Sequence, residues 1–281
     1  MKISKPKFWD QNYHTLLSIL LFPVSLFYRI IIFLKKIKST EERFSIPLIC
    51  VGNIYIGGTG KTPLCIELFD TLKNLNKRAV FIRKKYTAFE DEVNLLKQNG
   101  PIYEGTTRAI AINKAIENKF EIAILDDGFQ DFSIKKNLSI LCFNEKQWVG
   151  NGFSIPSGPL REGLSALKRA HCVLINGKKN INIEKKILEK NKSIKIFYSS
   201  YIPQNISNFK NKKIICFAGI GNPENFFSLL KENKIDILEE ISFPDHYNYS
   251  KIELENLIKK AKEKNSILLT TEKDYFRIHK D

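Results

Sequence analysis

The chain has 281 residues, 43% of them hydrophobic and 27% charged, which is enough apolar sequence to bury a core and excludes general disorder. Its formal net charge is +15, yet the lysines are spread along the chain without an arginine-rich arm or a known reader motif. We therefore expect anionic small molecules or lipid headgroups as partners and no nucleic acid. The five cysteines form no C-x-x-C pair and lie mostly in apolar runs, which indicates buried thiols rather than disulfides or a zinc site.

The first predicted element is an apolar helix. No charged residue lies between Thr15 and Tyr28, and Arg29 is followed by five more apolar residues and a lysine-rich stretch. A bilayer span needs ~20 apolar residues, a length that this segment reaches only if Arg29 is tolerated, and Pro23 also interrupts it. We expect residues 1–40 to form a membrane-associated helix in the interface, and a buried helix of a soluble domain is the alternative.

From residue 46 onward, apolar runs alternate with helical patterns. The predicted strands are Ile46 to Val51, Ala79 to Ile82, Ile122 to Leu125, Leu138 to Phe143, Cys172 to Ile175, Ile194 to Tyr198, Ile214 to Ala218 and Ile267 to Thr270. The predicted helices include Leu64 to Leu75, Thr107 to Asn118, Asn225 to Glu232 and Lys251 to Lys264. Such alternation, with strands that lack a polar face, predicts an α/β fold whose parallel sheet is covered by helices on both sides.

A domain boundary is expected near residues 200–212. Pro203-Gln204-Asn205 interrupts the alternating pattern, and a new strand–loop–helix unit starts at Ile214. We therefore expect residues 41–205 to form the main domain and residues 206–281 a smaller C-terminal lobe.

A glycine-rich loop, Gly57-Gly58-Thr59-Gly60-Lys61-Thr62, lies between the first predicted strand and a predicted helix. In this arrangement backbone N–H groups surround the phosphates of a nucleotide, the lysine neutralises β- and γ-phosphate oxygens, and the threonine hydroxyl binds Mg²⁺. The strict pattern has glycine where this chain has Tyr55, and a glycine-rich turn with an incidental lysine is the alternative. The predicted nucleotide-binding residues are Tyr55, Ile56, Gly57, Gly58, Thr59, Gly60, Lys61 and Thr62.

Two adjacent carboxylates, Asp126 and Asp127, end the predicted strand at Ile122 to Leu125. An apolar strand that ends in carboxylates is typical of the Mg²⁺ side of a phosphate-loop enzyme. Successive strand residues point to opposite faces, so only one of the two can face the metal directly, and the pattern does not say which. We expect Thr62, Asp126 and Asp127 to form the metal site, with an Asp-Asp-Gly turn as the alternative.

The Asp126-Asp127-Gly128-Phe129-Gln130 segment resembles the DDGFQ signature of the tetraacyldisaccharide 4'-kinase family. Five other segments are similar to the family's and lie in its order: Val51–Asn53 with Gly57–Pro63, Ser157–Glu162, Phe217–Pro223, Phe243–His246 and Thr271–Asp274. The resemblance implies a P-loop NTPase core, a smaller C-terminal lobe that closes over the nucleotide and a membrane-associated N-terminal helix.

The resemblance also implies an activity. It is transfer of the γ-phosphate of ATP, with Mg²⁺, to the 4'-hydroxyl of a tetraacylated glucosamine disaccharide 1-phosphate, which makes lipid IVA at the cytoplasmic face of the inner membrane. No obligate protein partner is expected.

The resemblance further assigns a base to the reaction. Glu90-Asp91-Glu92-Val93 corresponds to the family's Gly-Asp-Glu-Pro segment, so Asp91 is the expected proton acceptor, with His246 as its partner and Lys61 as the phosphate ligand. A solvated acid at a helix start and a simple loop histidine are the respective alternatives. The expected substrate-binding or supporting residues are Glu92, Gln130, Arg161, Glu162 and Asn222.

Two other functions share many of these features. A membrane-attached regulatory NTPase would have the same phosphate loop, acidic strand end and apolar helix, but would need no base beside an acceptor hydroxyl. A soluble small-molecule kinase would use the N-terminal helix only as part of its core.

Overall fold

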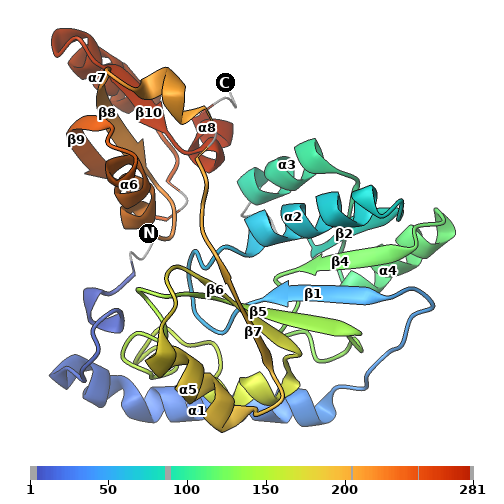
Figure 1. Ribbon diagram of the computed structural model, residues 1–281. Helices are drawn as coiled ribbons and strands as arrows, with labels where there is room; N and C mark the ends of the chain where they lie inside the picture. The colour runs from blue at the N-terminus through green and yellow to red at the C-terminus, as the bar shows by residue number, and fades with distance from the viewer. Residues whose placement is uncertain (1–4, 86–89, 204, 246, 279–281) are drawn as a thin grey trace. The chain divides into compact units, whose positions relative to one another are not determined.

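The computed structural model describes residues 5–85, 90–203, 205–245 and 247–278 (Figure 1). Its strands are β1 (Leu48–Gly52), β2 (Ala79–Lys84), β3 (Ile102–Gly105), β4 (Ile122–Asp126), β5 (Leu138–Asn144), β6 (Cys172–Asn176), β7 (Lys195–Ser199), β8 (Lys213–Ala218), β9 (Asp236–Ser242) and β10 (Ile267–Thr270). Its α-helices are α1 (Leu16–Lys38), α2 (Lys61–Asn74), α3 (Glu90–Asn99), α4 (Arg108–Glu117), α5 (Ile181–Lys190), α6 (Pro223–Glu232), α7 (Lys251–Glu263) and α8 (Glu272–Ile278). Short 3₁₀ helices are η1 (Lys7–Trp9), η2 (Leu164–Arg169) and η3 (Ile206–Phe209).

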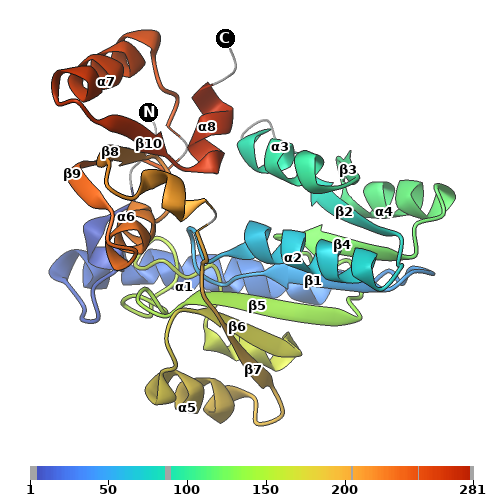
Figure 2. The same cartoon turned by 45° about the horizontal axis from the view of Figure 1, so that its top comes forward.

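The larger sheet has seven strands in the order β3-β2-β4-β1-β5-β6-β7, and every neighbouring pair is parallel. This confirms the predicted α/β fold with a parallel sheet. The register pairs Val51 with Asp126, and Figures 1 and 2 show that β1 and β4 end at the same edge. The loops that follow these two strands therefore leave the sheet side by side, which is where phosphate-binding loops lie in parallel α/β folds.

Helices cover both faces of this sheet, as the apolar strands require. On one face α2 supplies Cys65 and Phe69 to a core that includes Phe81 and Ile124. On the other face, α4 and α5 pack on a larger core that includes Leu48, Cys50 and Leu125. Figure 2 shows α2 and α5 on opposite sides of the sheet. All five cysteines are buried free thiols, which confirms the prediction made from the apolar runs around them.

Helix α1 has the reverse of a normal burial pattern. Its buried residues are Ser18 and Ser25, whereas large apolar side chains such as Leu20 and Phe27 are 74% and 65% exposed. Ser25 Oγ donates to the carbonyl of Ser154 at 2.8 Å and accepts from the Ser157 amide at 2.9 Å. The backbone carbonyl of Ser18 also accepts a hydrogen bond from Ser157 Oγ. The helix is thus attached to the protein on the face that carries Ser18 and Ser25, and most of its large apolar residues face outward. The alternative of a core helix of a soluble domain is therefore wrong.

The chain divides into two compact units. The larger one comprises the described residues of Pro6–Thr87 and Leu96–Ser200, and the smaller one comprises those of Met1–Lys5, Ala88–Leu95 and Tyr201–Asp281. The smaller unit has its own parallel sheet, in the order β10-β8-β9, and its own core around Ile214, Cys216 and Phe227. A boundary between independently folding domains at residues 205–206 remains a prediction.

All eight predicted strands are present, within two residues at each end, and β3 and β9 are additional. The strand predicted from Ile46 begins at Leu48, after Pro47, which has no amide to donate to a ladder. The two strands that the apolar pattern missed are Ile-Tyr-Glu-Gly and Asp-Ile-Leu-Glu-Glu-Ile-Ser, which lie at sheet edges and carry charged residues. An edge strand needs no continuous apolar run because one side of it faces water.

Candidate functional site

The glycine-rich loop connects β1 to α2 at the carboxyl edge of the larger sheet. Asn53, which is fully buried, donates from Nδ2 to the Gly57 carbonyl at 3.3 Å and to Thr59 Oγ1 at 3.0 Å. Gly57 and Gly60 have φ angles of 128° and 90°, which side chains disfavour, so glycine permits the turns on both sides of Thr59. Gly60 is the N-cap of α2, and the loop therefore ends at the positive end of the helix dipole.

The backbone amides of the loop are available to bind a ligand. Within the described part of the chain, no protein acceptor is hydrogen-bonded to the N–H groups of residues 57–62. Tyr55 and Ile56 are placed differently: the Tyr55 side chain is fully buried and its hydroxyl donates to Asp10, and the Ile56 amide donates to the Pro159 carbonyl at 2.9 Å. These two residues hold the start of the loop to neighbouring segments, and their contact with a nucleotide remains a prediction.

Asp127 lies beside the loop. Its φ is 51°, so it leaves the regular strand, and its side chain is 30% exposed. Lys61 Nζ lies 3.9 Å from Oδ1, and Arg161 Nη1 donates to Oδ1 at 2.8 Å and to Oδ2 at 2.9 Å. Burial would raise the pKa of this carboxyl, but Lys61, Arg161 and Arg108 outweigh it and hold the pKa below its usual value. Asp127 is therefore ionised at neutral pH and faces the loop.

Asp126 faces the interior instead. Its carboxylate is 2% exposed, lies 3.5 Å from Arg83 Nη1 and accepts a weak hydrogen bond from Cys65 Sγ at 3.8 Å. Arg108 Nη2 donates to the carbonyls of Asp126 at 3.2 Å and Asp127 at 2.7 Å. The two adjacent acids thus have different environments, because Asp126 ends the regular strand and points inward, whereas the left-handed backbone of Asp127 turns its side chain toward the loop.

The donor set fits a nucleotide with Mg²⁺. No cluster of three or more His, Cys, Asp or Glu residues suited to a metal occurs in the described ranges. Mg²⁺ bound with a nucleotide needs only one or two protein oxygens, because phosphates and waters complete its shell. Thr62 in the first turn of α2 and Asp127 supply oxygens of the right kind. The unused amides of the loop supply donors for the phosphates.

A network of polar side chains, formed by Gln130, Glu162 and Arg169, lies next to this site. Gln130 Nε2 donates to the Asn53 carbonyl at 2.8 Å and to Glu162 Oε1 at 3.3 Å. Glu162 accepts both of its shortest hydrogen bonds from Arg169 Nη2, at 2.9 and 2.8 Å. Gln130 and Glu162 therefore fix Asn53 and, through it, the glycine-rich loop. The Arg169 guanidinium also stacks over the ring of Phe129 at 4.7 Å. Sequence reasoning missed Arg169, and no motif points to it.

The other predicted site residues that the structure describes belong to the smaller unit. Asp91, in the first turn of α3, is 5% exposed and is paired with Arg277 of α8 at 2.6 Å. Glu92 is paired with Lys273 at 2.6 Å. Asn222 is the N-cap residue of α6 and makes no side-chain capping hydrogen bond. His246 lies outside the described residues. The described residues thus separate the predicted site into a phosphate-loop group in the larger unit and an Asp91 group in the smaller one.

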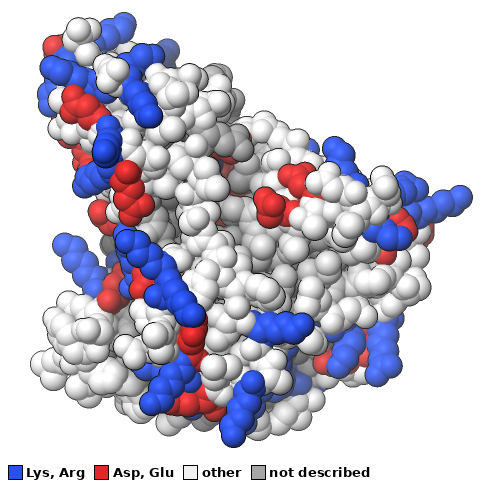
Figure 3. All heavy atoms as spheres, viewed as in Figure 1, with Lys and Arg blue, Asp and Glu red and all other residues white. Residues whose placement is uncertain are grey.

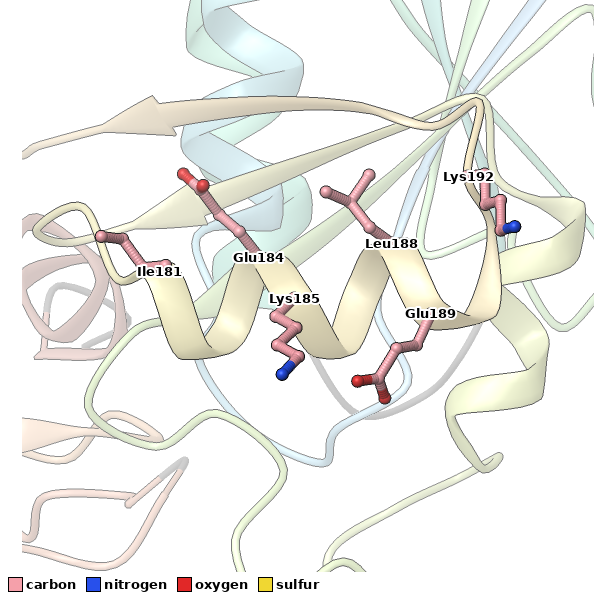
Figure 4. Close-up of a pocket in the computed structure, with 6 residues that line it drawn as sticks. All are labelled: Ile181, Glu184, Lys185, Leu188, Glu189 and Lys192. Atoms are coloured by element: carbon pink, nitrogen blue, oxygen red, sulfur yellow. The ribbon is translucent and has the colours of Figure 1, made fainter.

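The surface offers no better-defined candidate among the described residues. The hollow in Figure 4 is lined by Ile181, Glu184, Lys185, Leu188, Glu189 and Lys192, all on or just beyond α5, and it contains none of the predicted site residues. Another hollow is lined by Arg43, Phe44, Lys135, Lys136, Asn137 and His171. On the face shown in Figure 3, Lys and Arg are interspersed with Asp and Glu rather than gathered in one patch.

Comparisons with known proteins agree with the geometry. Residues 17–281 match the family model for tetraacyldisaccharide-1-P 4'-kinase (LpxK). A tetraacyldisaccharide 4'-kinase from Pelagibacter ubique is 46% identical over 99% of this chain and 89% of its own length, and one from Rickettsia canadensis is 34% identical over 99% and 90%. A crystal structure of LpxK from Aquifex aeolicus in complex with ATP is similar with a TM-score of 0.70 and 26% identity, covering 94% of this chain and 91% of that one. The chain therefore belongs to the tetraacyldisaccharide 4'-kinase family.

Proposed function

We propose that the chain is an ATP-dependent kinase that transfers the γ-phosphate of ATP to the 4'-hydroxyl of a tetraacylated glucosamine disaccharide 1-phosphate. The product is lipid IVA, an intermediate of lipid A biosynthesis. The observation that carries the proposal is the loop of residues 57–62, whose unused amides lie beside Lys61 and the ionised Asp127 in a chain of this family.

The residues of the larger unit bind and orient the nucleotide. The amides of residues 57–62 and the Lys61 ammonium bind the β- and γ-phosphates, and Thr62 and Asp127 hold Mg²⁺, which supplies neutralisation of phosphate charge when bound. Arg161 is held against Asp127 at 2.8 Å and adds a second fixed cation for phosphate oxygens. Asp126 forms a buried ion pair with Arg83. This pair fixes the end of β4 and so holds the neighbouring Asp127 in position for the metal.

The residues of the smaller unit act on the acceptor in this proposal. Asp91 accepts the proton of the 4'-hydroxyl, His246 is its partner, and Glu92 and Asn222 support the acceptor or nucleotide. Residues 206–281 form the smaller lobe of this proposal. The support for Asp91 is its placement: a buried carboxylate in the first turn of a helix, held by named cations rather than solvated.

The test is phosphate transfer from labelled ATP to the lipid disaccharide in detergent micelles. We expect labelled lipid to form only with ATP, Mg²⁺ and the acceptor present together, because the acceptor supplies the reacting hydroxyl and the metal neutralises phosphate charge. The control is ATP hydrolysis without acceptor. Nucleotide turnover that is equal with and without the lipid would contradict the kinase and support a regulatory NTPase.

In this proposal the enzyme lies at the cytoplasmic face of the inner membrane, where ATP is present, and the exposed apolar residues of α1 support its membrane association. The helix is long and apolar enough to cross a bilayer by length and composition. We favour an interfacial position, because the face of the helix that carries Ser18 and Ser25 is bound to the protein, through the Ser18 carbonyl and the Ser25 hydroxyl, and only the other face is available to lipid.

Changing exposed apolar residues of α1 should release the protein from lipid without unfolding it. We expect the Leu20→Gln, Phe27→Gln double variant to lose most of its sedimentation with phospholipid vesicles, because both side chains are largely exposed and contribute little to the core. The matched control is Leu75→Gln with Ile110→Gln, which removes exposed apolar residues of α2's C-cap and of α4. Equal sedimentation of the two double variants would rule out α1 as the membrane-binding element.

A further inference from the structure

Helix α8 carries an arginine that joins three separate segments of the smaller unit. Arg277 Nε and Nη2 donate to Asp91 Oδ2 at 3.0 and 2.6 Å. Its Nη1 donates to the Gly219 carbonyl at 2.5 Å and to Asp274 Oδ1 at 2.8 Å. The guanidinium therefore links the start of α3, the loop after β8 and its own helix.

The contact is buried on both sides. The side chains of Arg277 and Asp91 are 7% and 5% exposed. Removing an ion pair from water is costly unless further hydrogen bonds satisfy the donors and acceptors. The planar fork of arginine meets this condition here, because its Nε and Nη2 edge faces Asp91 while Nη1 faces Gly219 and Asp274. An ammonium group has no such fork and cannot keep all three partners at once.

The other end of the contact is also fixed. Asp274 is fully buried, and its Oδ2 accepts from the Gly219 amide at 3.1 Å and from Thr271 Oγ1 at 2.7 Å. Tyr249 donates to Oδ1 at 3.0 Å. A Cβ on Gly219 would lie 2.9 Å from Tyr249 Oη, so glycine is what allows this close approach. The Asp274 carboxylate thus binds the first amide of the loop after β8, and the carbonyl of the same residue, Gly219, accepts from Arg277.

We propose that Arg277 is a positioning residue for the phosphoryl transfer, which holds the Asp91 carboxylate at a fixed place relative to the loop at Gly219. The inference rests on the proposed role of Asp91. A proton acceptor works only when it is held in reach of the hydroxyl, and a displacement of ~1 Å costs on the order of 10²-fold in rate. Lys273, 3.8 Å from Asp91 Oδ2, is mainly bound to Glu92 at 2.6 Å and does not replace the fork.

The experiment compares Arg277→Gln, Arg277→Lys and Asp91→Asn in the full chain. We expect Arg277→Gln to lower kcat on the order of 10–10²-fold with little change in the KM for ATP, because the phosphate loop belongs to the other unit. Arg277→Lys should recover part of the loss. The control Lys231→Gln removes a different ion pair of the smaller unit, with Glu240 at 2.6 Å, and should leave kcat unchanged.

A double-mutant cycle separates positioning from stability. If Arg277 acts through Asp91, adding Arg277→Gln to Asp91→Asn should lower kcat little further than Asp91→Asn does alone. A lowered melting temperature with full kcat below that temperature would overturn the proposal and leave a structural clamp. Independent, additive losses would also overturn it. Full activity of Asp91→Asn itself would instead reject the proposed base, whatever Arg277 does.

Discussion

Replacing Asp127 with asparagine is expected to lower kcat on the order of 10²–10³-fold, as losing one preorganised electrostatic contact at a phosphoryl-transfer site does. The carboxylate is the ionised acid that faces Lys61, at 3.9 Å, and the phosphate loop. Asparagine has the same shape and tolerates the left-handed φ of 51° at this position, so backbone strain does not obscure the result.

The loss should be traceable to the metal. The affinity for ATP, measured by titration calorimetry, should rise with Mg²⁺ in the unmodified enzyme and rise much less in Asp127→Asn. The matched control is Glu121→Gln, an ion-paired carboxylate next to the opposite end of β4, which bonds to Lys77 at 3.0 Å. If Asp127→Asn keeps full activity and full Mg²⁺ dependence, Asp127 serves only to pair with Arg161 and the metal site has to be sought elsewhere.

Asp91→Asn is expected to lower kcat by ~10²–10⁴-fold, the usual contribution of a positioned general base. Its ATP affinity should remain near that of the unmodified enzyme, because the phosphate loop lies in the other unit. The measurement is single-turnover transfer to the lipid acceptor together with ATP binding.

Glu92→Gln is the matched control for this variant. It neutralises the neighbouring carboxylate of the same helix turn, which is bound to Lys273 rather than to Arg277. We expect a much smaller loss, since Glu92 is a supporting residue. Near-normal turnover of Asp91→Asn, or equal losses in both variants, would remove Asp91 from the role of proton acceptor.

Much of the binding group was predictable because it is local in the sequence. The glycine-rich loop, Lys61 and Thr62 form one continuous segment between an apolar strand and a helix, and that pattern already requires the loop to lie at a sheet edge. The strand that ends in Asp126 and Asp127 was predicted for the same reason. A strand whose residues are all apolar is buried on both of its faces, and such strands are typical of a parallel sheet covered by helices on both sides.

The partners of these residues were not predictable, because they come from distant segments. Arg83, Arg108 and Arg161 reach the two acids from β2, α4 and the segment after Leu160. Arg277 reaches Asp91 across 186 positions of sequence. The only trace of that contact in the sequence is the i,i+3 spacing of Asp274 and Arg277, which many helices share.

The sequence by itself determined the covered parallel sheet, the phosphate loop at its edge, the family and the apolar N-terminal helix, because each depends on neighbouring residues and on their periodicity. The tertiary structure alone decided which acid faces the loop, which face of α1 binds the protein, and how Asp91 is held. The first depends on the irregular backbone at the end of β4, and the other two depend on contacts between segments that are distant in the sequence. The partners in such contacts are selected only when the chain packs in three dimensions.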